Sequence, residues 1–241
     1  MSGAAGQLDG QTVVVIGGSS GIGLATARRA RAGQANVIIT GRDPERLHSA
    51  GLELQASIAA FDAFDFDRLD RFFEELPGPI DHVLVTGPGP YYAPLPELDF
   101  AKARRHLETH LLLPLRIGQN APGRVRPGGT LLFVGGTGGR RPSSGAMITA
   151  LTAALPALTR NLALELAPIR VNLIAPGFVD TPLSARLLGD QLEARREQLR
   201  TTLPIRRIVG PDDVAAVALH LMTNTAVTGA TYDVDGGQQL L

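Results

Sequence analysis

The sequence predicts a single α/β domain, a doubly wound fold in which helices cover both faces of a parallel sheet. Three observations lead to this prediction. Short apolar runs rich in β-branched residues alternate with longer segments of helical periodicity along the whole chain. A glycine-rich turn joins the first run to the first helical segment. No linker, repeat or low-complexity segment divides residues 1–241, so they are expected to form one domain, with residues 1–9 flexible.

The expected strands are short apolar runs bounded by turn-forming residues. In chain order they are Thr12–Ile16, Asn36–Thr40, a weaker run near Ala56–Ala60, His82–Thr86, Thr130–Val134, Arg170–Ile174 and Thr231–Val234. Such near-continuous apolar character is typical of strands that are buried on both faces of a parallel sheet.

The expected helices lie between these strands and carry apolar residues at three- to four-residue spacing. They are Ile22–Ala32, Pro44–Gly51, Phe66–Leu76, Phe100–Ala121, Ser144–Leu166 and Pro211–Met222. Pro156 conflicts with the fifth helix, because proline inside a helix costs about 3 kcal/mol, so we expect a kink or a different boundary there. The charged, helix-prone segment Thr181–Pro204 is expected to form a flap after the sixth strand.

Composition argues against several classes of function. The formal net charge is zero, so neither nucleic acid nor an anionic membrane is expected as a partner. The absence of cysteine excludes disulfides, thiol catalysis and Cys-ligated metal, and the five histidines are scattered, so no metal site is expected. The N-terminal residues do not resemble a secretory signal, and no run of about 18 uncharged apolar residues is present, so a cytoplasmic location is expected.

The first turn has the features of a dinucleotide-binding loop. It reads Gly17-Gly18-Ser19-Ser20-Gly21-Ile22-Gly23 between a strand and a helix. Glycines permit a tight turn and let the backbone approach a pyrophosphate, and the helix N-terminus offers unpaired N–H groups to the anion. The candidate phosphate-binding residues are Gly17, Ser19, Ser20, Gly21, Ile22 and Gly23.

The end of the second strand favours NADP(H) over NAD(H). An acidic residue at this position would bind a ribose 2′-hydroxyl, but the chain has Thr40-Gly41-Arg42. Gly41 leaves room for a 2′-phosphate, Arg42 can pair with it, and Ser19 is a second candidate donor. The alternative is that Arg42 is a solvated turn residue.

These residues and several later motifs resemble the short-chain dehydrogenase/reductase family over essentially the whole chain. The later motifs are Phe64-Asp65-Phe66-Asp67, Asn161-Leu162-Ala163-Leu164-Glu165-Leu166, Ile169-Arg170-Val171-Asn172, Pro176-Gly177-Phe178-Val179-Asp180-Thr181, Thr228-Gly229 and Val234-Asp235-Gly236-Gly237. The resemblance implies a Rossmann fold with a seven-stranded sheet, NADP(H)-dependent oxidoreductase activity and assembly as a homodimer or homotetramer. It adds cofactor contacts at Asp65, Phe66, Gly87, Pro88, Pro176, Gly177, Val179 and Thr181.

The resemblance fails where the family places its catalytic residues. The position of the family's tyrosine is Ile148 and that of its lysine is Thr152. The serine position is Gly136, or Gly135 if the loop differs by one residue, and the asparagine position is His110. No Tyr-x-x-x-Lys pair exists anywhere, because the tyrosines are Tyr91, Tyr92 and Tyr232 and the one lysine is Lys102. The sequence therefore predicts a non-standard active site.

Three residues remain as candidate proton donors or polarising groups: His110, Tyr92 and Thr152. A histidine suits proton transfer near neutral pH, although His110 can equally fill a helix kink by hydrogen bonding. Tyr92, like Tyr91, is either an acid or an aromatic wall of the pocket. Thr152 can donate a hydrogen bond but cannot carry a positive charge. Arg140 and Arg141 either bind an anionic substrate, are solvated, or lie in a subunit interface.

Three functions follow from this pattern, and the sequence identifies no substrate for any of them. The first is an NADP(H)-dependent oxidoreductase with a non-standard proton donor that acts on a small molecule. The second is a catalytically inactive NADP(H)-binding sensor, regulator or partner subunit. The third is an isomerase or lyase that uses the pocket without net hydride transfer.

Overall fold

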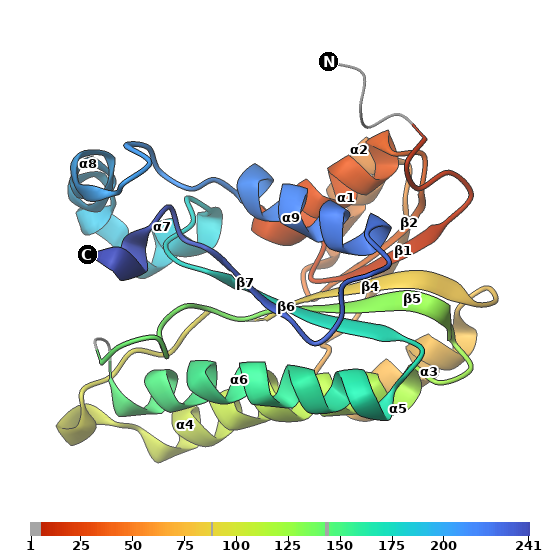
Figure 1. Cartoon of the computed structure of the whole chain (residues 1–241), viewed down its shortest axis with the longest axis horizontal. Helices are drawn as coiled ribbons and strands as arrows, with labels where there is room; N and C mark the ends of the chain where they lie inside the picture. Colours follow the sequence, from red (N-terminus) through yellow and green to blue (C-terminus); the bar gives the residue numbers. More distant parts are fainter. Residues whose placement is uncertain (1–5, 88, 143–144) are drawn as a thin grey trace.

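The computed structural model describes residues 6–87, 89–142 and 145–241, in which seven parallel strands form one sheet. The strands are β1 (Thr12–Ile16), β2 (Asn36–Gly41), β3 (Ser57–Ala60), β4 (Ile80–Thr86), β5 (Val125–Val134), β6 (Arg170–Pro176) and β7 (Thr231–Val234). Their order is β3-β2-β1-β4-β5-β6-β7, so the chain reverses its direction across the sheet between β1 and β4 (Figure 1). The predicted seven-stranded, doubly wound fold is confirmed.

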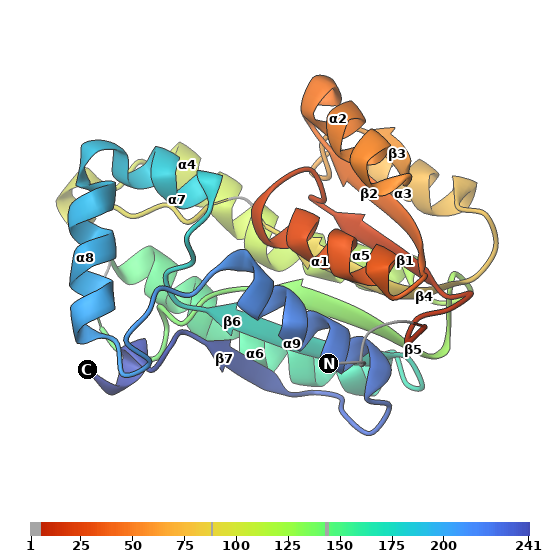
Figure 2. The same ribbon diagram turned by 90° about the horizontal axis from the view of Figure 1, so that it is seen from above.

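Helices cover both faces of the sheet (Figures 1 and 2). One face carries α1 (Gly21–Ala32), α2 (Pro44–Leu54) and α9 (Pro211–Thr223), and the other carries α3 (Phe66–Glu75), α4 (Phe100–Leu107), α5 (Leu113–Asn120) and α6 (Ala146–Glu165). The central strands contribute side chains to both of the cores that lie between the sheet and its two layers of helices. Val13 and Val15 of β1 pack towards α1 and α9, whereas Val14 and Ile16 pack towards α3 and α5. This alternation explains why β1 is apolar at every position.

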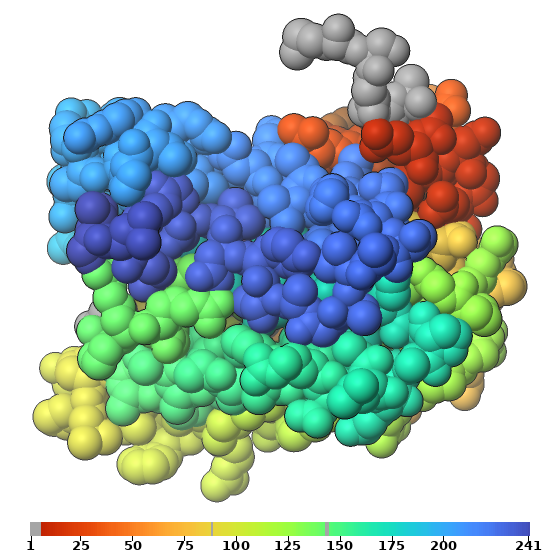
Figure 3. Space-filling view, in the orientation of Figure 1, coloured from red at the N-terminus to blue at the C-terminus, as the bar shows by residue number. Residues whose placement is uncertain are grey.

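The expected flap consists of two helices, α7 (Pro182–Leu188) and α8 (Leu192–Thr202). It forms a separate lobe at the upper left of the space-filling view, with a notch between it and the rest of the upper face (Figure 3). Arg196 of α8 binds Asp180 at the base of the flap, with an Nη2–Oδ1 distance of 2.6 Å. Leu199 of α8 and Leu203, which directly follows that helix, are buried.

The helix expected at Phe100–Ala121 is interrupted. A π-helical turn, Glu108–Leu112, separates α4 from α5, and Leu113 donates its N–H to the carbonyl of Glu108, five residues earlier. The cause is Pro114, which has no N–H to donate to the carbonyl of His110. A single continuous helix was therefore the wrong expectation for this segment.

The helix expected at Ser144–Leu166 begins at Ala146, after the non-helical N-cap Gly145, and Ser144 lies outside the described residues. The helix continues through Pro156 to Glu165. By length and composition alone α6 is apolar enough to cross a membrane, although the sequence was expected to contain no such segment. One side of α6 packs on the sheet through Leu151, Leu155 and Leu162, which accounts for its apolar character.

Of residues 1–9, which were expected to be flexible, the structure describes residues 6–9. Leu8 is fully buried, and its N–H donates to the carbonyl of Gly33. Residues 6–9 are therefore packed against α1 and β2 in part.

Candidate active site

The candidate site lies at the carboxyl ends of the parallel strands. Ligands of open α/β sheets bind where the strand order reverses, which here is the crevice between β1 and β4. The predicted cofactor residues that the structure describes lie at the carboxyl ends of β1, β2, β3, β4 and β6, in the loops that follow or in the first turns of the next helices. The fold therefore brings them to one edge of the sheet.

The turn after β1 is built around glycines that have no room for a side chain. A Cβ on Gly23 would lie 2.1 Å from the carbonyl oxygen of Gly17, and one on Gly17 would lie 2.2 Å from Oγ1 of Thr86. Gly17 and Gly21 also have positive φ angles, of 88° and 53°. The turn therefore keeps the backbone of α1 close to β1 and β4 and leaves its outer surface bare.

The N-terminus of α1 opens towards this bare surface. Ser20 precedes the helix in an extended conformation, and its side chain makes no capping hydrogen bond. Gly21, Ile22 and Gly23 form the first turn, where backbone N–H groups have no partner within the helix. These unpaired donors and the helix dipole suit a pyrophosphate.

The loop after β2 places Ser19 beside Gly41. A Cβ on Gly41 would lie 3.1 Å from the Ser19 hydroxyl oxygen, so the two residues share one small space. The next residue, Arg42, is exposed and has no ion-pair partner among the residues that the structure describes. A guanidinium without an ion-pair partner, next to a hydroxyl and a glycine, can bind a phosphate group.

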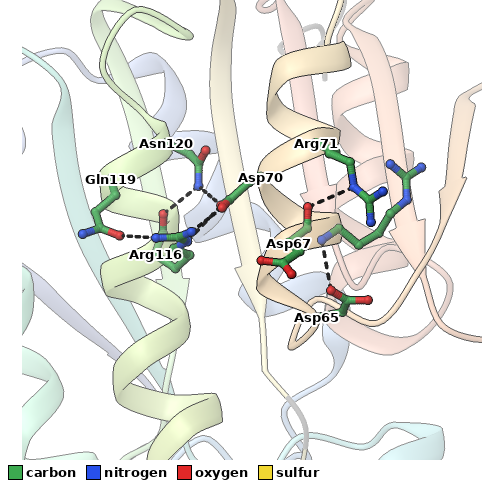
Figure 4. Close-up of polar contacts among 8 residues, drawn as sticks. Asp65, Asp67, Asp70, Arg71, Arg116, Gln119 and Asn120 are labelled. Carbon is green, nitrogen blue, oxygen red and sulfur yellow. Dashed lines mark hydrogen bonds and ion pairs between the residues drawn. The ribbon is translucent and has the colours of Figure 1, made fainter.

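Asp65 caps the N-terminus of a helix, which is a structural role that the sequence did not reveal. Its Oδ1 accepts the backbone N–H of Arg68 at 3.0 Å, so its carboxylate caps the N-terminus of α3 (Figure 4). Phe66 is the first residue of that helix.

Asp62 was missed as a candidate, although it comes two residues after β3. The N–H of its neighbour Phe61 donates to the carbonyl of Gly41, which places Asp62 at the same edge as Arg42. Asp62 and Asp65 line a hollow of about 500 Å³ with Phe64 of the same loop and with Arg104 and Arg105 of α4. The position of Asp62 after a strand was the signal that could have identified it.

The loops after β4 and β6 complete the edge. Gly87 follows Thr86 and has open space around it, whereas the predicted contact Pro88 lies outside the described residues. Pro176 ends β6, and Gly177 packs so closely on Asp235 that a Cβ would lie 2.7 Å from that side chain. Thr181 caps α7, and its Cγ2 lies 3.5 Å from the Cβ position of Gly21. The loops after β1 and β6 therefore meet.

Val179 has a different position from the other predicted contacts. It is 6% exposed and forms an isolated parallel bridge with Val209. Its backbone thus ties the start of the flap to the segment that precedes α9.

The start of α6 faces the loop after β5. Thr152 is buried, and its hydroxyl donates to the carbonyl of Ile148 at 2.8 Å, within its own helix. Ile148 is also buried. A Cβ on Gly136 would lie 3.7 Å from Cγ2 of Thr152, which is ordinary van der Waals contact. The hydroxyl of Thr152, expected to be available to a substrate, is therefore bound to α6.

His110 lies in the π-helical turn, where it lines a small cavity of about 20 Å³ with Gly87, Val134 and Leu155. Its Nδ1 is 3.1 Å from the carbonyl oxygen of His106 and 3.0 Å from the hydroxyl of Thr109. Burial lowers the pKa of His110 below its usual value. The hydrogen bond to His106 raises it in part, and the charge of His106 lowers it further. The hydrogen-bonding role in the kink is thus present, and His110 borders the same small cavity as Gly87.

The two tyrosines after β4 have different surroundings. Tyr91 stacks on His106, and its hydroxyl accepts the N–H of Asp99 at 3.0 Å. Tyr92 is 56% exposed. Tyr91 therefore packs against α4, whereas Tyr92 is exposed.

Arg140 and Arg141 do not face the site as free cations. Arg140 binds Asp233 of β7 through two hydrogen bonds, at 2.9 and 2.5 Å, and Arg141 donates to the carbonyl of Gln238 at 3.0 Å. Both arginines are exposed, and both tie the loop after β5 to the C-terminal segment.

His106 and His110 also correct the expectation that the histidines are scattered. They lie one helical turn apart, and their rings stack with centroids 5.2 Å apart. Parallel rings do not direct their nitrogen lone pairs at a common point. Within the described part of the chain, no group of three His, Asp or Glu side chains is arranged around a metal position.

Comparison with known proteins identifies the family. The family model described as enoyl-(acyl carrier protein) reductase matches residues 16–239. The short-chain dehydrogenase/reductase ATR9 of Stachybotrys chlorohalonatus is 31% identical over 249 aligned residues, which cover 95% of this chain and 96% of that protein. The chain is a short-chain dehydrogenase/reductase. Pig (Sus scrofa) dehydrogenase/reductase SDR family member 4 is also 31% identical, covering 95% of this chain and 88% of its own.

Solved structures of similar proteins superimpose on almost the whole chain. The MalC reductase/Diels-Alderase of Malbranchea aurantiaca gives a TM-score of 0.91 at 27% identity, covering 98% of this chain and 99% of its own. BdcA in complex with NADPH gives 0.86 at 28% identity, covering 96% and 95%. The family resemblance inferred from the glycine turn and the later motifs is therefore confirmed.

Proposed function

We propose that this short-chain dehydrogenase/reductase is an NADP(H)-dependent oxidoreductase with a non-standard active site. The observation that carries the proposal is the cradle after β1. Gly17 and Gly23 tolerate no side chain, and the N-terminus of α1 presents backbone donors that no side chain caps. When bound, a nicotinamide cofactor supplies or accepts a hydride. Gly87 follows β4, and Gly177 and Thr181 follow β6, so in this proposal they would orient the cofactor from the same edge of the sheet.

Three residues support NADP(H) in preference to NAD(H). Ser19 and Gly41 enclose a small space beside Arg42, and Arg42 has no ion-pair partner among the described residues. The Arg42 guanidinium could donate charge-assisted hydrogen bonds to the 2′-phosphate of NADP(H). Two structural relatives are described in complex with NADPH, BdcA and a small-chain dehydrogenase, and their likeness favours the same cofactor here.

The active site is non-standard because the four family positions carry other residues. Ile148 and Thr152 replace the tyrosine and lysine, Gly136 replaces the serine, and His110 replaces the asparagine. A general acid or base contributes roughly 10²–10⁴-fold in rate, whereas placement of the reactants contributes separately. A site without the family pair can therefore still transfer hydride if another group moves the proton. His110 and Tyr92 are the candidates.

The alternative is a catalytically inactive NADP(H)-binding sensor, regulator or partner subunit. The arrangement of α6 favours it, because Ile148 offers no proton and the Thr152 hydroxyl is bound to the helix backbone. In this case the loops at the carboxyl ends of the strands would bind NADP(H) without catalysis. A structural change elsewhere in the protein would then signal that the cofactor is bound.

A reaction without net hydride transfer is favoured by one relative. The MalC protein is described both as a reductase and as a Diels-Alderase, so a chain of this fold can use its pocket for a cycloaddition. An isomerase, lyase or cyclase of this kind would form product without consuming cofactor.

The deciding experiment is a titration with NADPH and NADH, followed by the fluorescence of the reduced nicotinamide. We expect NADPH to bind more tightly than NADH. We expect Arg42→Ala to weaken NADPH at least tenfold, about 1.4 kcal/mol, and to leave NADH nearly unchanged. Arg126→Ala is the matched control, since Arg126 lies near the amino ends of the strands, beside Asp81. Failure of both cofactors to bind would overturn the proposal.

Activity is then tested with a panel of carbonyl compounds, imines and enones. Oxidation of NADPH above background that is lost in His110→Ala or Tyr92→Phe supports the oxidoreductase. Tight binding without turnover of any compound supports the inactive alternative, and product without cofactor consumption supports the third reaction class.

A further inference from the structure

The elements in which the family places its serine, tyrosine and lysine contain no side chain that releases a proton near pH 7. From Pro127 to Thr159, which includes most of β5, the loop after it and most of α6, the ionisable residues are Arg140 and Arg141 alone. An arginine keeps its proton in proteins, and these two are held by Asp233 and Gln238. β5 and α6 therefore supply no general acid to the cofactor edge, the carboxyl edge of the sheet where the cofactor is proposed to bind.

The hydroxyl at the family's lysine position is also bound within the protein. Thr152 donates to the carbonyl of Ile148 at 2.8 Å, and the carbonyl of Thr149 lies within 3.3 Å of the same oxygen. A Cβ on Gly136 would lie 3.7 Å from Cγ2 of Thr152, and one on Gly138 would lie 3.4 Å from its Oγ1. The side chain thus faces a loop of glycines, and neither it nor the loop brings a charge to this position.

The remaining candidate donors are poorly suited to give a proton. A stack of three rings, Tyr91, His106 and His110, has centroids 5.5 and 5.2 Å apart and ends at the cofactor edge with His110. Nδ1 of His110 lies 3.1 Å from the carbonyl of His106, which can only accept, so the neutral ring has its hydrogen on Nδ1 and none on Nε2. Burial lowers the pKa of His110, which favours this neutral ring. Tyr92 is exposed, and no hydrogen bond between described residues orients its hydroxyl.

The need for a proton depends on the substrate. Hydride addition to a ketone produces an alkoxide, a strong base, and an acid that protonates it contributes roughly 10²–10⁴-fold in rate. Hydride addition to an iminium ion has no such requirement. The carbon accepts the hydride, the two π electrons of the C=N bond become the lone pair of the nitrogen, and the product is a neutral amine.

We propose that the substrate of this site is a preformed iminium ion, which the protein reduces to a tertiary amine without a proton donor. The proposal rests on the oxidoreductase function proposed above and adds its substrate class. The substrate carbon takes the hydride from the reduced nicotinamide, no proton moves, and the positive charge leaves the substrate for the nicotinamide ring. Thr152 is compatible with this substrate, whereas a lysine at the same position would place a second cation beside it.

The first test compares two bicyclic compounds of similar size, 2-methyl-3,4-dihydroisoquinolinium and α-tetralone, with NADPH and the full chain. After subtraction of the rate without protein, we expect kcat/KM for the iminium to exceed that for the ketone at least about a hundredfold. Comparable values would overturn the proposal, and so would NADPH binding, seen by fluorescence, without turnover of the iminium. If NADPH does not bind at all, the proposed oxidoreductase function itself fails.

The second test asks whether a proton moves during the reaction. The iminium carbon and nitrogen of the chosen compound carry no exchangeable proton. We therefore expect its kcat/KM to stay constant within about twofold from about pH 6.5 to 8.5, and to change less than about 1.3-fold in D₂O. A solvent isotope effect of about twofold or more would show proton transfer in the rate-limiting step and would contradict the proposal.

The third test places a charge at the position of Thr152. Thr152→Lys and Thr152→Met both introduce a long side chain, but only the lysine is a cation. At about pH 6.5 we expect Thr152→Lys to lower kcat/KM for the iminium at least about tenfold further than Thr152→Met does. With NADP⁺, which cannot reduce the iminium, addition of the iminium should raise the melting temperature less in the lysine variant. Equal behaviour of the two variants would contradict a cationic substrate at this position. Melting curves without ligand check that both variants fold, and the first two tests depend on neither.

Discussion

Single residues in this protein show how burial changes an ordinary side chain. His82 of β4 is 3% exposed, its Nε2 lies 2.7 Å from Oε1 of Gln11, and its Nδ1 is buried without a partner among the described residues. Burial lowers the pKa of His82 to about 4, with Asp81 opposing and Arg170 reinforcing the shift. The folded protein therefore holds this ring neutral where the unfolded chain would protonate it.

This shift predicts a loss of stability in mild acid. Below pH 6.5 the unfolded chain binds a proton that the folded protein excludes, so the free energy of unfolding falls as the pH drops from about 6.5 to about 4. The loss attributable to His82 is about 3 kcal/mol. Urea unfolding at several pH values should show a flatter profile for His82→Gln than for the unmodified protein. His48→Gln, at an exposed position of α2, should leave the profile unchanged.

At the same scale, the sequence predicted the glycine-rich turn after β1 better than the side-chain contacts of other residues. Glycines such as Gly17 and Gly23 are informative because their role depends on local backbone geometry, which a short motif defines. Asp65 and Thr152 were harder to interpret, because their side chains bind their own helices, as a cap and as a bond to Ile148. Arg140 was unpredictable, since its partner Asp233 is 93 residues away.

Among the elements, α9 depends on a buried arginine from a neighbouring strand. Arg170 of β6 is 6% exposed and donates to the carbonyls of Leu221 and Met222, in the last turns of the helix, and of Asn224 and Val227 beyond it. The final carbonyls of a helix have no hydrogen-bond donor within the helix, so the Arg170 guanidinium supplies these donors. The contact fixes α9 on the sheet.

Removal of this cap should destabilise the whole domain. In Arg170→Met several carbonyls would be left buried without donors, which predicts a loss of about 2–4 kcal/mol in the free energy of unfolding. Urea denaturation followed by circular dichroism measures it. Arg71→Met, at an exposed position of α3, is the matched control and should cost less than about 0.5 kcal/mol. Similar losses in the two variants would contradict the capping role.

The flap depends on weaker contacts, so its behaviour should be local. Asp180 and Arg196 are about a quarter to a third exposed, and such a pair contributes up to about 1 kcal/mol. We expect Asp180→Asn to raise amide hydrogen exchange in α7 and α8 by about two- to fivefold without lowering the melting temperature. Glu197→Gln, which breaks the more exposed pair with Arg200 in the same helix, should change exchange less. Faster exchange throughout the sheet would argue against a local effect.

The interruption between α4 and α5 shows where periodicity fails as a guide. Apolar spacing continues across Phe100–Ala121, so the pattern predicts one helix, yet Pro114 shifts the hydrogen bonding by one residue at the π-helical turn. The contacts of α5 remain regular. Arg116 and Asn120 both bind Asp70 of α3, which joins the two helices on one face (Figure 4). The seven strands were easier to predict, because burial on both faces makes them uniformly apolar.

At the scale of the whole molecule, the outer surface of α5 and α6 is unusually apolar. Leu112 and Leu115 are 45% and 41% exposed on the π-helical turn and α5, and Leu164 at the end of α6 is 79% exposed. Between them, the exposed side of α6 carries alanines at positions 146, 150, 153 and 157. Small and apolar side chains allow two helices to approach closely, so we propose that a second copy of the chain covers this surface.

This proposal predicts a homodimer or homotetramer in solution. Light scattering after size exclusion should give a multiple of the 25.4 kDa chain mass. Leu164→Asp would place a charge in the interface and should shift the protein towards the monomer. Leu52→Asp, at a residue 69% exposed on α2, alters a similar leucine on the opposite face and should leave the mass unchanged. A monomeric unmodified protein would refute the assembly.

Lys102 gives the ring stack an experimental use. It is the one lysine of the chain, and its ammonium lies 5.9 Å from the centroid of Tyr91, at the outer end of the stack. Among side chains, an amine-reactive fluorophore would therefore label a single position. A dye attached there sits at the surface end of the column whose inner ring borders the cofactor edge, so its emission would report ligand binding without an engineered cysteine.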